Sequence, residues 1–244
     1  MNTSVAYSLY RFAWGSLDLI FPPNCGGCSK PGSRWCKDCQ SKIQNLVEPI
    51  CDICGISIDV PGLCVDCQRM RPRYRILRSW SVFDDPVRNA LHKLKYRRDV
   101  ALGDALAAQL KEFAASLKWH ADMIVPVPLG KKRSGERGYN QVSLIARPLA
   151  LAIGMTFAPE ALSRVRETRS QVGLTKAERR ANVSGAFQAQ RTRVNGRIVL
   201  LMDDVATTGS TLSSCAEALY AAGARDVFAL TVARALAHHG LSNV

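Results

Sequence analysis

A run of about 20 apolar residues, the length that a membrane-spanning helix needs, does not occur in this sequence. The nearest stretch, residues 5–21, is interrupted by Arg11 and Asp18, and it lacks the charged n-region and the small-residue cleavage site of a secretion signal. We therefore predict a cytoplasmic protein without a membrane span, in which residues 1–24 form a short amphipathic helix. In that compartment cysteines are more often metal ligands than disulfide partners.

Acidic residues are scarce relative to basic ones. The 244 residues include 33 Lys and Arg but only 20 Asp and Glu, which gives a net charge of +13. Residues 68–79 contain five arginines and no acid, and residues 131–180 contain eleven basic residues and four acids. Such a surface attracts polyanions, so a phosphate-rich partner such as nucleic acid is one interpretation. A basic surface that only maintains solubility is the other, and composition alone does not choose between them.

The cysteines are concentrated near the N-terminus. Eight of the nine form four C-x-x-C pairs within residues 25–67, and the ninth, Cys215, is predicted to be a small buried side chain. Two C-x-x-C turns complete a tetrahedron of thiolates around Zn²⁺. Metal binding contributes on the order of 10 kcal/mol of folding free energy, which a segment so rich in glycine and proline needs. The alternatives are disulfides, which a cytoplasmic location disfavours, and a redox site, which four equal pairs disfavour.

The spacing of the pairs does not decide which of them share a metal. Because a shorter loop costs less entropy to close, we predict that consecutive pairs make two structural zinc sites. The predicted ligands are Cys25, Cys28, Cys36 and Cys39 at the first site, and Cys51, Cys54, Cys64 and Cys67 at the second.

A phosphate-binding pattern occupies residues 198–211. The apolar run 198–202 is typical of a buried strand, and it ends at Asp203 and Asp204. The small-residue loop and helix start that follow present backbone N–H groups and a positive helix end to an anion, and Gly209 permits close approach. The two carboxylates do not bind phosphate, but they accept hydrogen bonds from sugar hydroxyls or hold a divalent cation. A phosphorylated ribose fits this pattern, and simple capping of a loop and a helix is the alternative.

Other elements follow from periodicity and from helix start signals. A strand is expected at 80–83, and a helix that begins at residues 84–86 should bury Val87, Leu91 and Leu94. The remaining expected elements are a helix at 101–117, a strand at 123–127, a basic loop at 131–141 leading into a helix, a helix at 210–220 and a strand at 226–232.

Aromatic and basic residues alternate at the end of the helix that begins near residue 87. A single-stranded nucleic-acid groove combines base stacking with phosphate pairing in this way, whereas a solvated helix face has the same composition. The DNA-binding candidates are Lys93, Lys95, Tyr96, Arg97, Arg98 and Tyr139.

The string VLLMDDVATTGST at 199–211 resembles the signature of type I phosphoribosyltransferases, which bind phosphoribosyl pyrophosphate with Mg²⁺. The resemblance implies that the paired acids contact the ribose hydroxyls, that the loop cups the 5-phosphate, and that residues 164–187 close over the pyrophosphate. It assigns the ligand to Asp203, Asp204, Ala206, Thr207, Thr208, Gly209, Ser210 and Thr211. The pyrophosphate candidates are Lys131, Arg133, Arg137, Arg169 and Arg179.

The motifs together are similar to those of the ComF family of competence-associated proteins. They are FPPNC, the four C-x-x-C pairs, LKYRRD, VPVPLGKKRSGERGYNQ, RSQVGLTKAERRANVSGAF and the phosphate loop, and they cover nearly the whole chain. The resemblance implies an α/β fold, with a type I phosphoribosyltransferase-like parallel sheet and helices on both faces, preceded by a small zinc-ribbon module. The expected parts are the N-terminal helix at 1–24, a double zinc ribbon at 25–75 and the phosphoribosyltransferase-like domain at 76–244.

The resemblance also implies a role in natural transformation. The expected partners are single-stranded DNA, phosphoribosyl pyrophosphate or a nucleotide, and other DNA-uptake proteins. A related branch of the family is named for gluconate uptake, and the motifs do not separate the two branches. An active phosphoribosyltransferase that acts on an unidentified nitrogenous base is the alternative, although the sequence has no identifiable base-recognition pocket.

Overall fold

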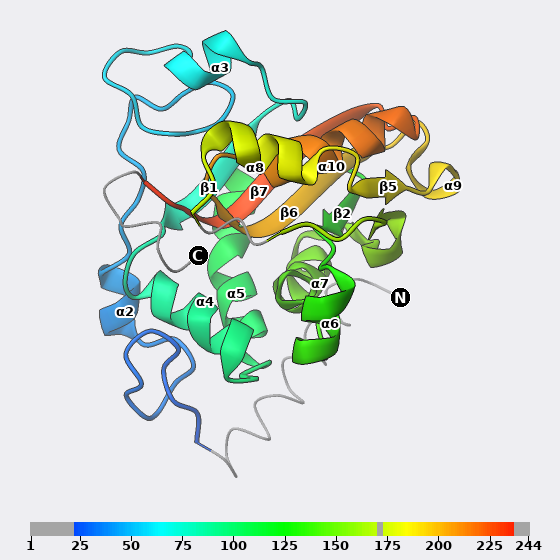
Figure 1. The fold of residues 1–244 in the computed structure, drawn as a ribbon. Helices are drawn as coiled ribbons and strands as arrows, with labels where there is room; N and C mark the ends of the chain where they lie inside the picture. Colours follow the sequence, from blue (N-terminus) through cyan, green and yellow to red (C-terminus); the bar gives the residue numbers. More distant parts are fainter. Residues whose placement is uncertain (1–21, 170–172, 237–244) are drawn as a thin grey trace.

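The computed structural model describes residues 22–169 and 173–236 (Figure 1). Residues 1–21 of the predicted N-terminal helix lie outside the described residues, as do residues 170–172 of the predicted pyrophosphate loop. Residues 22–24 are not helical, and Asn24 forms a β-bridge with Pro31. In the described part of the chain, no helix has both the length and the hydropathy to cross a membrane.

Five parallel strands form the central sheet in the order β1-β7-β6-β2-β3. They are β1 (Leu77–Val82), β2 (Met123–Pro126), β3 (Thr156–Phe157), β6 (Ile198–Ala206) and β7 (Asp226–Arg234). The long central strands β6 and β7 are mostly buried, as expected of parallel strands that are covered on both faces. A second, antiparallel sheet consists of β4 (Leu162–Arg164) and β5 (Phe187–Ala189).

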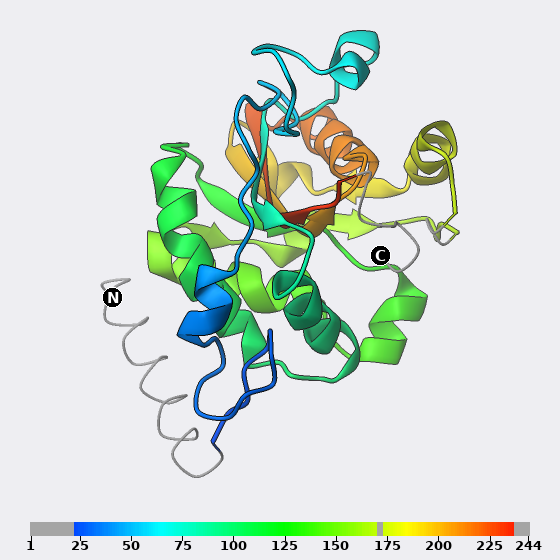
Figure 2. The same ribbon diagram turned by 90° about the vertical axis from the view of Figure 1, so that its left-hand side faces the viewer.

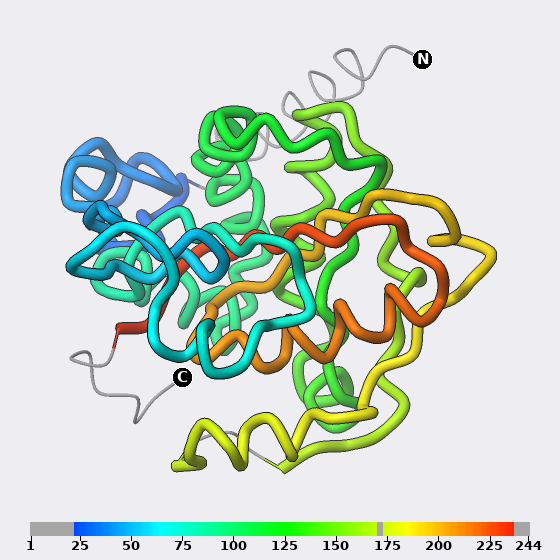
Figure 3. Tube along the Cα trace, turned by 90° about the horizontal axis from the view of Figure 1, so that it is seen from above, coloured from blue at the N-terminus to red at the C-terminus, as the bar shows by residue number. Residues whose placement is uncertain are grey.

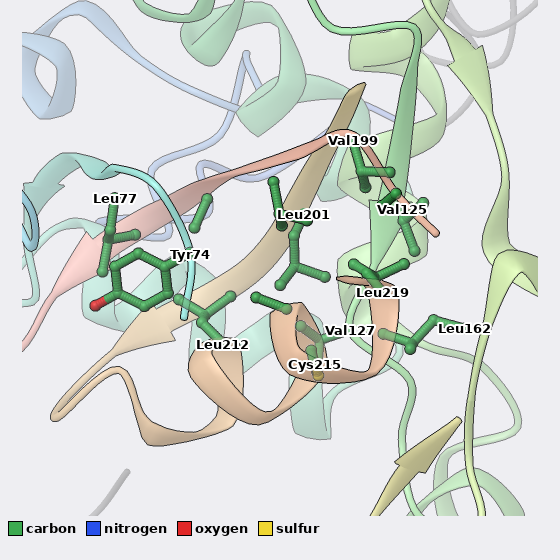
Figure 4. Packing of buried hydrophobic residues seen from close by; sticks show 14 of the residues in the cluster. Tyr74, Leu77, Val125, Val127, Leu162, Val199, Leu201, Leu212, Cys215 and Leu219 are labelled. Atoms are coloured by element: carbon green, nitrogen blue, oxygen red, sulfur yellow. The ribbon is translucent and has the colours of Figure 1, made fainter. Parts of the chain in front are cut away.

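Helices lie on both faces of the sheet (Figures 1 and 2). On one face, α10 packs Leu212, Cys215 and Leu219 against β6 side chains such as Leu201 (Figure 4). On the other face, α4, α5 and α7 bury a second apolar cluster. The predicted α/β fold class and the burial of Cys215 are therefore confirmed. The helices are α2 (Lys37–Ser41), α3 (Val65–Arg69), α4 (Val87–Tyr96), α5 (Leu102–Ser116), α6 (Lys131–Arg137), α7 (Gln141–Ile153), η1 (Pro159–Ala161), α8 (Lys176–Val183), α9 (Arg191–Val194) and α10 (Ser210–Ala221).

Most of the predicted elements are present, but three differ. Strand β6 continues past the apolar run as far as Ala206, because it pairs with β7 up to Arg234. The expected basic loop after residue 130 is largely the helix α6, which ends at Gly138 with φ +76°. Residues 164–187 run from the last residue of β4 to the first of β5, and they include the helix α8, whose capping box joins Thr175 and Glu178.

The two cysteine modules lie against opposite faces of the sheet. In the first, Trp35 and Ile43 pack against the cluster formed by α4, α5 and α7. In the second, Cys51, Ile53 and Cys54 belong to the cluster around α10. Seen from above, the second module lies beside α10 and the first lies further out (Figure 3). The second module is therefore the one that adjoins the predicted phosphate loop.

Candidate functional site

The eight paired cysteines form two groups of four. One group is Cys25, Cys28, Cys36 and Cys39, and the other is Cys51, Cys54, Cys64 and Cys67; within each group the sulfur atoms all lie within 4.8 Å of one another. Sulfur–sulfur distances of 3.5, 3.6 and 3.7 Å are close to the value of about 3.8 Å expected for a tetrahedron of thiolates at 2.3 Å from zinc. They are too long for disulfides, whose sulfurs lie about 2.05 Å apart. The predicted pairing of consecutive C-x-x-C turns is confirmed, and the donor set fits two structural zinc sites.

A pocket of about 190 Å³ opens at the carboxyl end of β6. It lies between the ends of β2 and β6, the N-terminus of α10, and side chains from α4, α6, α7 and α8. The predicted ligand residues in its lining are Asp203, Asp204, Ala206, Thr207, Gly209, Ser210 and Thr211, together with Arg133, Arg137, Arg169 and Arg179. Thr208 and Lys131 do not line this pocket, and the backbone N–H of Lys131 donates to Glu167 instead.

Asp204 of the strand β6 is held by two side chains, one from α4 and one from α7. The ammonium group of Lys95 lies 3.0 Å from its Oδ2 atom, and the amide of Gln141 donates to the same oxygen at 3.1 Å. The Oδ1 atom accepts from the backbone N–H of Val205. Burial by itself would raise the pKa of Asp204, but the charge of Lys95 and the hydrogen bonds from Lys95 and Gln141 outweigh it and lower that pKa. Asp204 is therefore an ionised and internally compensated carboxylate.

Asp203 has a different environment. It is half-buried in the pocket wall, and its Oδ1 atom accepts from the backbone N–H of Asp204 at 2.9 Å. Burial, followed by the negative charge of Asp204, raises the pKa of Asp203 well above its ordinary value. Ionised Asp203 is therefore destabilised in the free protein, and sugar hydroxyls or a cation would relieve that cost.

The loop between β6 and α10 has the geometry of an anion cup. Gly209 has φ +73°, a left-handed conformation that favours glycine, and a Cβ atom there would lie 2.7 Å from the hydroxyl of Tyr74. The N-cap residue Gly209 has no side chain to cap α10, and the backbone N–H of Ser210 donates to the Oγ1 atom of Thr208 at 3.3 Å, so a hydroxyl of the loop itself meets the helix start. The guanidinium of Arg179 donates to Thr207 at 3.0 Å and holds α8 against the loop.

The nucleic-acid candidates near α4 take several different positions. Lys95 and Tyr96 line the pocket, and the guanidinium of Arg137 lies 5.1 Å from the ring centre of Tyr96. Lys93 instead donates to the backbone oxygen of Cys25 and to Ser29, which fixes α4 to the first cysteine module. The hydroxyl of Tyr139 donates to the backbone oxygen of Leu94. Arg97 and Arg98 are exposed at the end of α4 and do not line the pocket.

Three contributors to the site have no clear signal in the sequence. Gln141 follows the helix cap Asn140, and only the fold brings its amide to Asp204. Arg164 lines the pocket from the end of β4, and Tyr74 reaches the loop from the segment before β1. The pairing of Lys95 with Asp204 was equally hidden, because 109 positions of sequence separate the two residues.

The comparisons with known proteins agree with these features. A family model described as a double zinc ribbon domain matches residues 16–68. The chain is 32% identical over 228 residues to the DNA utilization protein YhgH of Salmonella typhi. The matched region covers 89% of this chain and 100% of that protein. The chain is also 30% identical over 216 residues to the competence protein ComFC of Bacillus subtilis, in a match that covers 84% of this chain and 86% of that protein.

The chain belongs to the ComF family. This family contains proteins of competence and of DNA utilization, and the predicted membership is confirmed. Among solved structures, the ComF chain is similar to an adenine phosphoribosyltransferase at 20% identity and a TM-score of 0.36, over 58% of this chain and 74% of that one. A likeness at this level indicates nothing about activity.

Proposed function

We propose that this ComF protein is an accessory protein of DNA uptake that binds single-stranded DNA and a phosphoribosyl pyrophosphate-type ligand in the cytoplasm. The observation that supports the proposal is the pocket in which Asp203, the anion cup at residues 206–211 and several arginines meet. The proposal includes the boundaries of the double zinc ribbon at 25–75 and of the ligand-binding domain at 76–244. Other DNA-uptake proteins are its proposed partners.

The pocket offers a partner to each part of such a ligand. The N-terminus of α10 and the hydroxyls of the loop line the pocket and suit a 5-phosphate. Asp203 is placed to accept hydrogen bonds from ribose hydroxyls, since Asp204 is already held by Lys95 and Gln141. Arg133 and Arg169 line the same pocket and suit the charge of a pyrophosphate.

Magnesium is proposed to arrive with the ligand. Carboxylate oxygen is the donor that Mg²⁺ prefers, and Asp203 supplies one in the pocket wall. Because Lys95 pairs with Asp204, Asp203 is the acid of the two that is available to a cation. A single available carboxylate suits a cation already bound to pyrophosphate better than a bare ion held by the protein alone.

Single-stranded DNA is supported by the charge of the chain and by its relatives. A net charge of +13 attracts polyanions, and the matched proteins are named for competence and DNA utilization. A true phosphoribosyltransferase acting on a nitrogenous base is the second candidate, which the combination of Asp203, the anion cup and basic side chains favours. The only aromatic ring in the lining of this pocket is Tyr96, which is 62% exposed, so the pocket offers a base no buried ring to stack on.

Binding and turnover should be measured on the zinc-loaded protein. We expect fluorescent single-stranded DNA to bind with an affinity that falls steeply as salt increases, because counterions are released from each neutralised phosphate. Phosphoribosyl pyrophosphate with Mg²⁺ should bind to the wild type and more weakly to Asp203→Ala. Incubation with a panel of bases then separates the two candidates, since release of pyrophosphate would establish the transferase.

The control variant is Arg147→Gln. Arg147 is an exposed arginine of α7 that does not line the pocket, so its loss changes the net charge without touching the site. If Arg147→Gln weakens ligand binding as much as Arg169→Gln does, then net charge and not the pocket is responsible. Failure of the wild type to bind either DNA or phosphoribosyl pyrophosphate would refute the proposed function.

A further inference from the structure

The pocket beside Asp203 is smaller than the ligand-binding cavities of most proteins. Its volume of about 190 Å³ lies below the range of about 300–1,000 Å³ that is usual for small-molecule sites. Two larger cavities share its walls. One, of about 410 Å³, shares Arg133, Arg164, Thr168 and Arg169. The other, of about 830 Å³, shares Arg179, Thr207, Gly209 and Ser210.

The 830 Å³ cavity, which we call the ribbon cavity, lies on the far side of the phosphate loop. The second cysteine module, α8, α10 and the end of β7 surround it. An ion pair of 2.6 Å between Lys176 of α8 and Asp66 of α3 joins two of these walls. Basic side chains outnumber acidic ones in its lining. They are Arg71, Arg73, Lys176, Arg179, Arg180 and Arg234, against Asp66 and Glu217.

Two buried polar atoms in this lining have no hydrogen-bond partner among the described residues. They are the hydroxyl of Tyr74 and the Nε atom of Arg234. The side chains are deeply buried, since Tyr74 is 2% and Arg234 is 3% exposed. Figure 4 shows the Tyr74 hydroxyl pointing away from the core residues Leu201 and Leu212. An unsatisfied buried polar atom costs about 1–3 kcal/mol, so both atoms favour an occupant with hydrogen-bonding groups.

The chemistry of the lining fits a nucleotide. Arginines and hydroxyl groups suit phosphate and sugar, while Ile56, Met70 and Pro72 offer apolar contact to a base. The position of the cavity on the other side of the phosphate loop from Asp203 indicates how a nucleic-acid strand would run. In such a strand, the 5-phosphate of one nucleotide is also the 3-phosphate of its neighbour. A phosphate in the cup therefore has one ester bond toward Asp203 and can have a second toward the ribbon cavity.

We propose that the ribbon cavity binds the neighbouring nucleotide on the 5′ side of the one whose ribose lies against Asp203. A single strand then crosses the phosphate loop with one phosphodiester in the cup. This proposal rests on the proposed function, because it takes the cup as a phosphate site. It moves the main DNA contact from the exposed end of α4 to the junction between the phosphate loop and the second cysteine module.

The test compares ligands that reach the ribbon cavity with ligands that do not. The probes are a 15-residue oligothymidylate, a thymidine 5′-monophosphate and phosphoribosyl pyrophosphate with Mg²⁺. The variant combines Arg73→Gln with Arg180→Gln, which removes two exposed charges from the lining. The matched control is Arg75→Gln, since Arg75 is an exposed arginine of the same segment that pairs with Asp226 and does not line the cavity.

We expect the double variant to lose about tenfold in affinity for the oligothymidylate at 0.1 M salt. Its log–log salt slope should become shallower by about 0.7 for each phosphate contact removed. Its affinities for the monophosphate and for phosphoribosyl pyrophosphate should change less than twofold, and Arg75→Gln should behave as the wild type. Unchanged oligothymidylate binding, or equal losses for all three ligands, would overturn the proposal. If the wild type binds none of the ligands, the proposed function fails instead.

Tyr74→Phe provides a second measurement that leaves the charge unchanged. Because the hydroxyl has no partner in the described chain, its removal should not lower the melting temperature. Affinity for the oligothymidylate should fall about threefold if the hydroxyl contacts the strand. A lower melting temperature with unchanged strand affinity would mean that the hydroxyl is satisfied within the folded protein, and it would count against the proposal.

Discussion

Replacing Asp204 by asparagine should lower the melting temperature, whereas replacing its neighbour Asp203 by asparagine should raise it. Asp204→Asn removes the charge that Lys95 faces at 3.0 Å. If Oδ1 of the asparagine still accepts from the backbone N–H of Val205, its amide nitrogen takes the place of Oδ2. This nitrogen is a donor, and it would face two other donors, the Lys95 ammonium and the Gln141 amide. Breaking a buried ion pair on one side costs about 3–5 kcal/mol. Because the side chains of Lys95 and Asp204 are still 13% and 9% exposed, we expect Asp204→Asn to lower the free energy of unfolding by the lower of these values, about 3 kcal/mol.

Asp203→Asn should stabilise the free protein. It retains the Oδ1 acceptor for the backbone N–H of Asp204 and removes a carboxylate whose pKa is raised by burial and by Asp204. We expect the free energy of unfolding to rise at neutral pH, because asparagine lacks the carboxylate charge that burial and the charge of Asp204 disfavour. For a chain of this size, 1 kcal/mol shifts the melting temperature by about 2–4 °C. The expected changes in melting temperature are therefore a fall of about 6–12 °C for Asp204→Asn and a rise for Asp203→Asn.

The assay is thermal unfolding of the ligand-free, zinc-loaded protein, followed by circular dichroism between pH 4 and pH 8. A raised pKa means that the wild type loses stability as the pH rises from the ordinary carboxyl range through the raised value. The advantage of Asp203→Asn should grow over that window and vanish below it. Equal destabilisation by both substitutions, or an advantage of Asp203→Asn that does not depend on pH, would refute this account of the pair.

Two further predictions concern the phosphate loop and the zinc sites. Gly209→Ala should lower the melting temperature by more than Gly154→Ala does. Both glycines have a positive φ, for which the left-handed strain of alanine alone costs about 1–2 kcal/mol, or about 2–8 °C, but of the two only position 209 would bring a Cβ atom against a neighbour, the hydroxyl of Tyr74. Equal losses for the two variants would contradict this contact. Cys64→Ser and Cys28→Ser should each lower bound zinc from two ions to one per chain by metal analysis. Only Cys64→Ser should also weaken phosphoribosyl pyrophosphate binding, since its module adjoins the loop; equal weakening by both would contradict that coupling.

Local patterns in the sequence were enough to predict several parts of this protein. The two groups of four cysteines follow from C-x-x-C spacing, and loop entropy correctly favoured consecutive pairs. The strand β6 and the helix α10 follow from an apolar run and a helix start signal. The helix α8 was not predicted, although its capping box of Thr175 and Glu178 is visible in the sequence, because a mostly exposed helix has little apolar periodicity.

The sequence by itself determined the two groups of four cysteines, the strand β6 and the helix α10, because short-range spacing and apolar patterns govern all three; the fold class followed from the resemblance to the family. Only the tertiary structure decided which charges meet. Lys95 pairs with Asp204, and Tyr74 and Arg234 face a cavity beside the second cysteine module, because packing around the sheet joins segments far apart in the chain. Composition revealed an excess of basic residues, but the way in which they are divided between ion pairs, helix ends and cavity walls depends on long-range geometry.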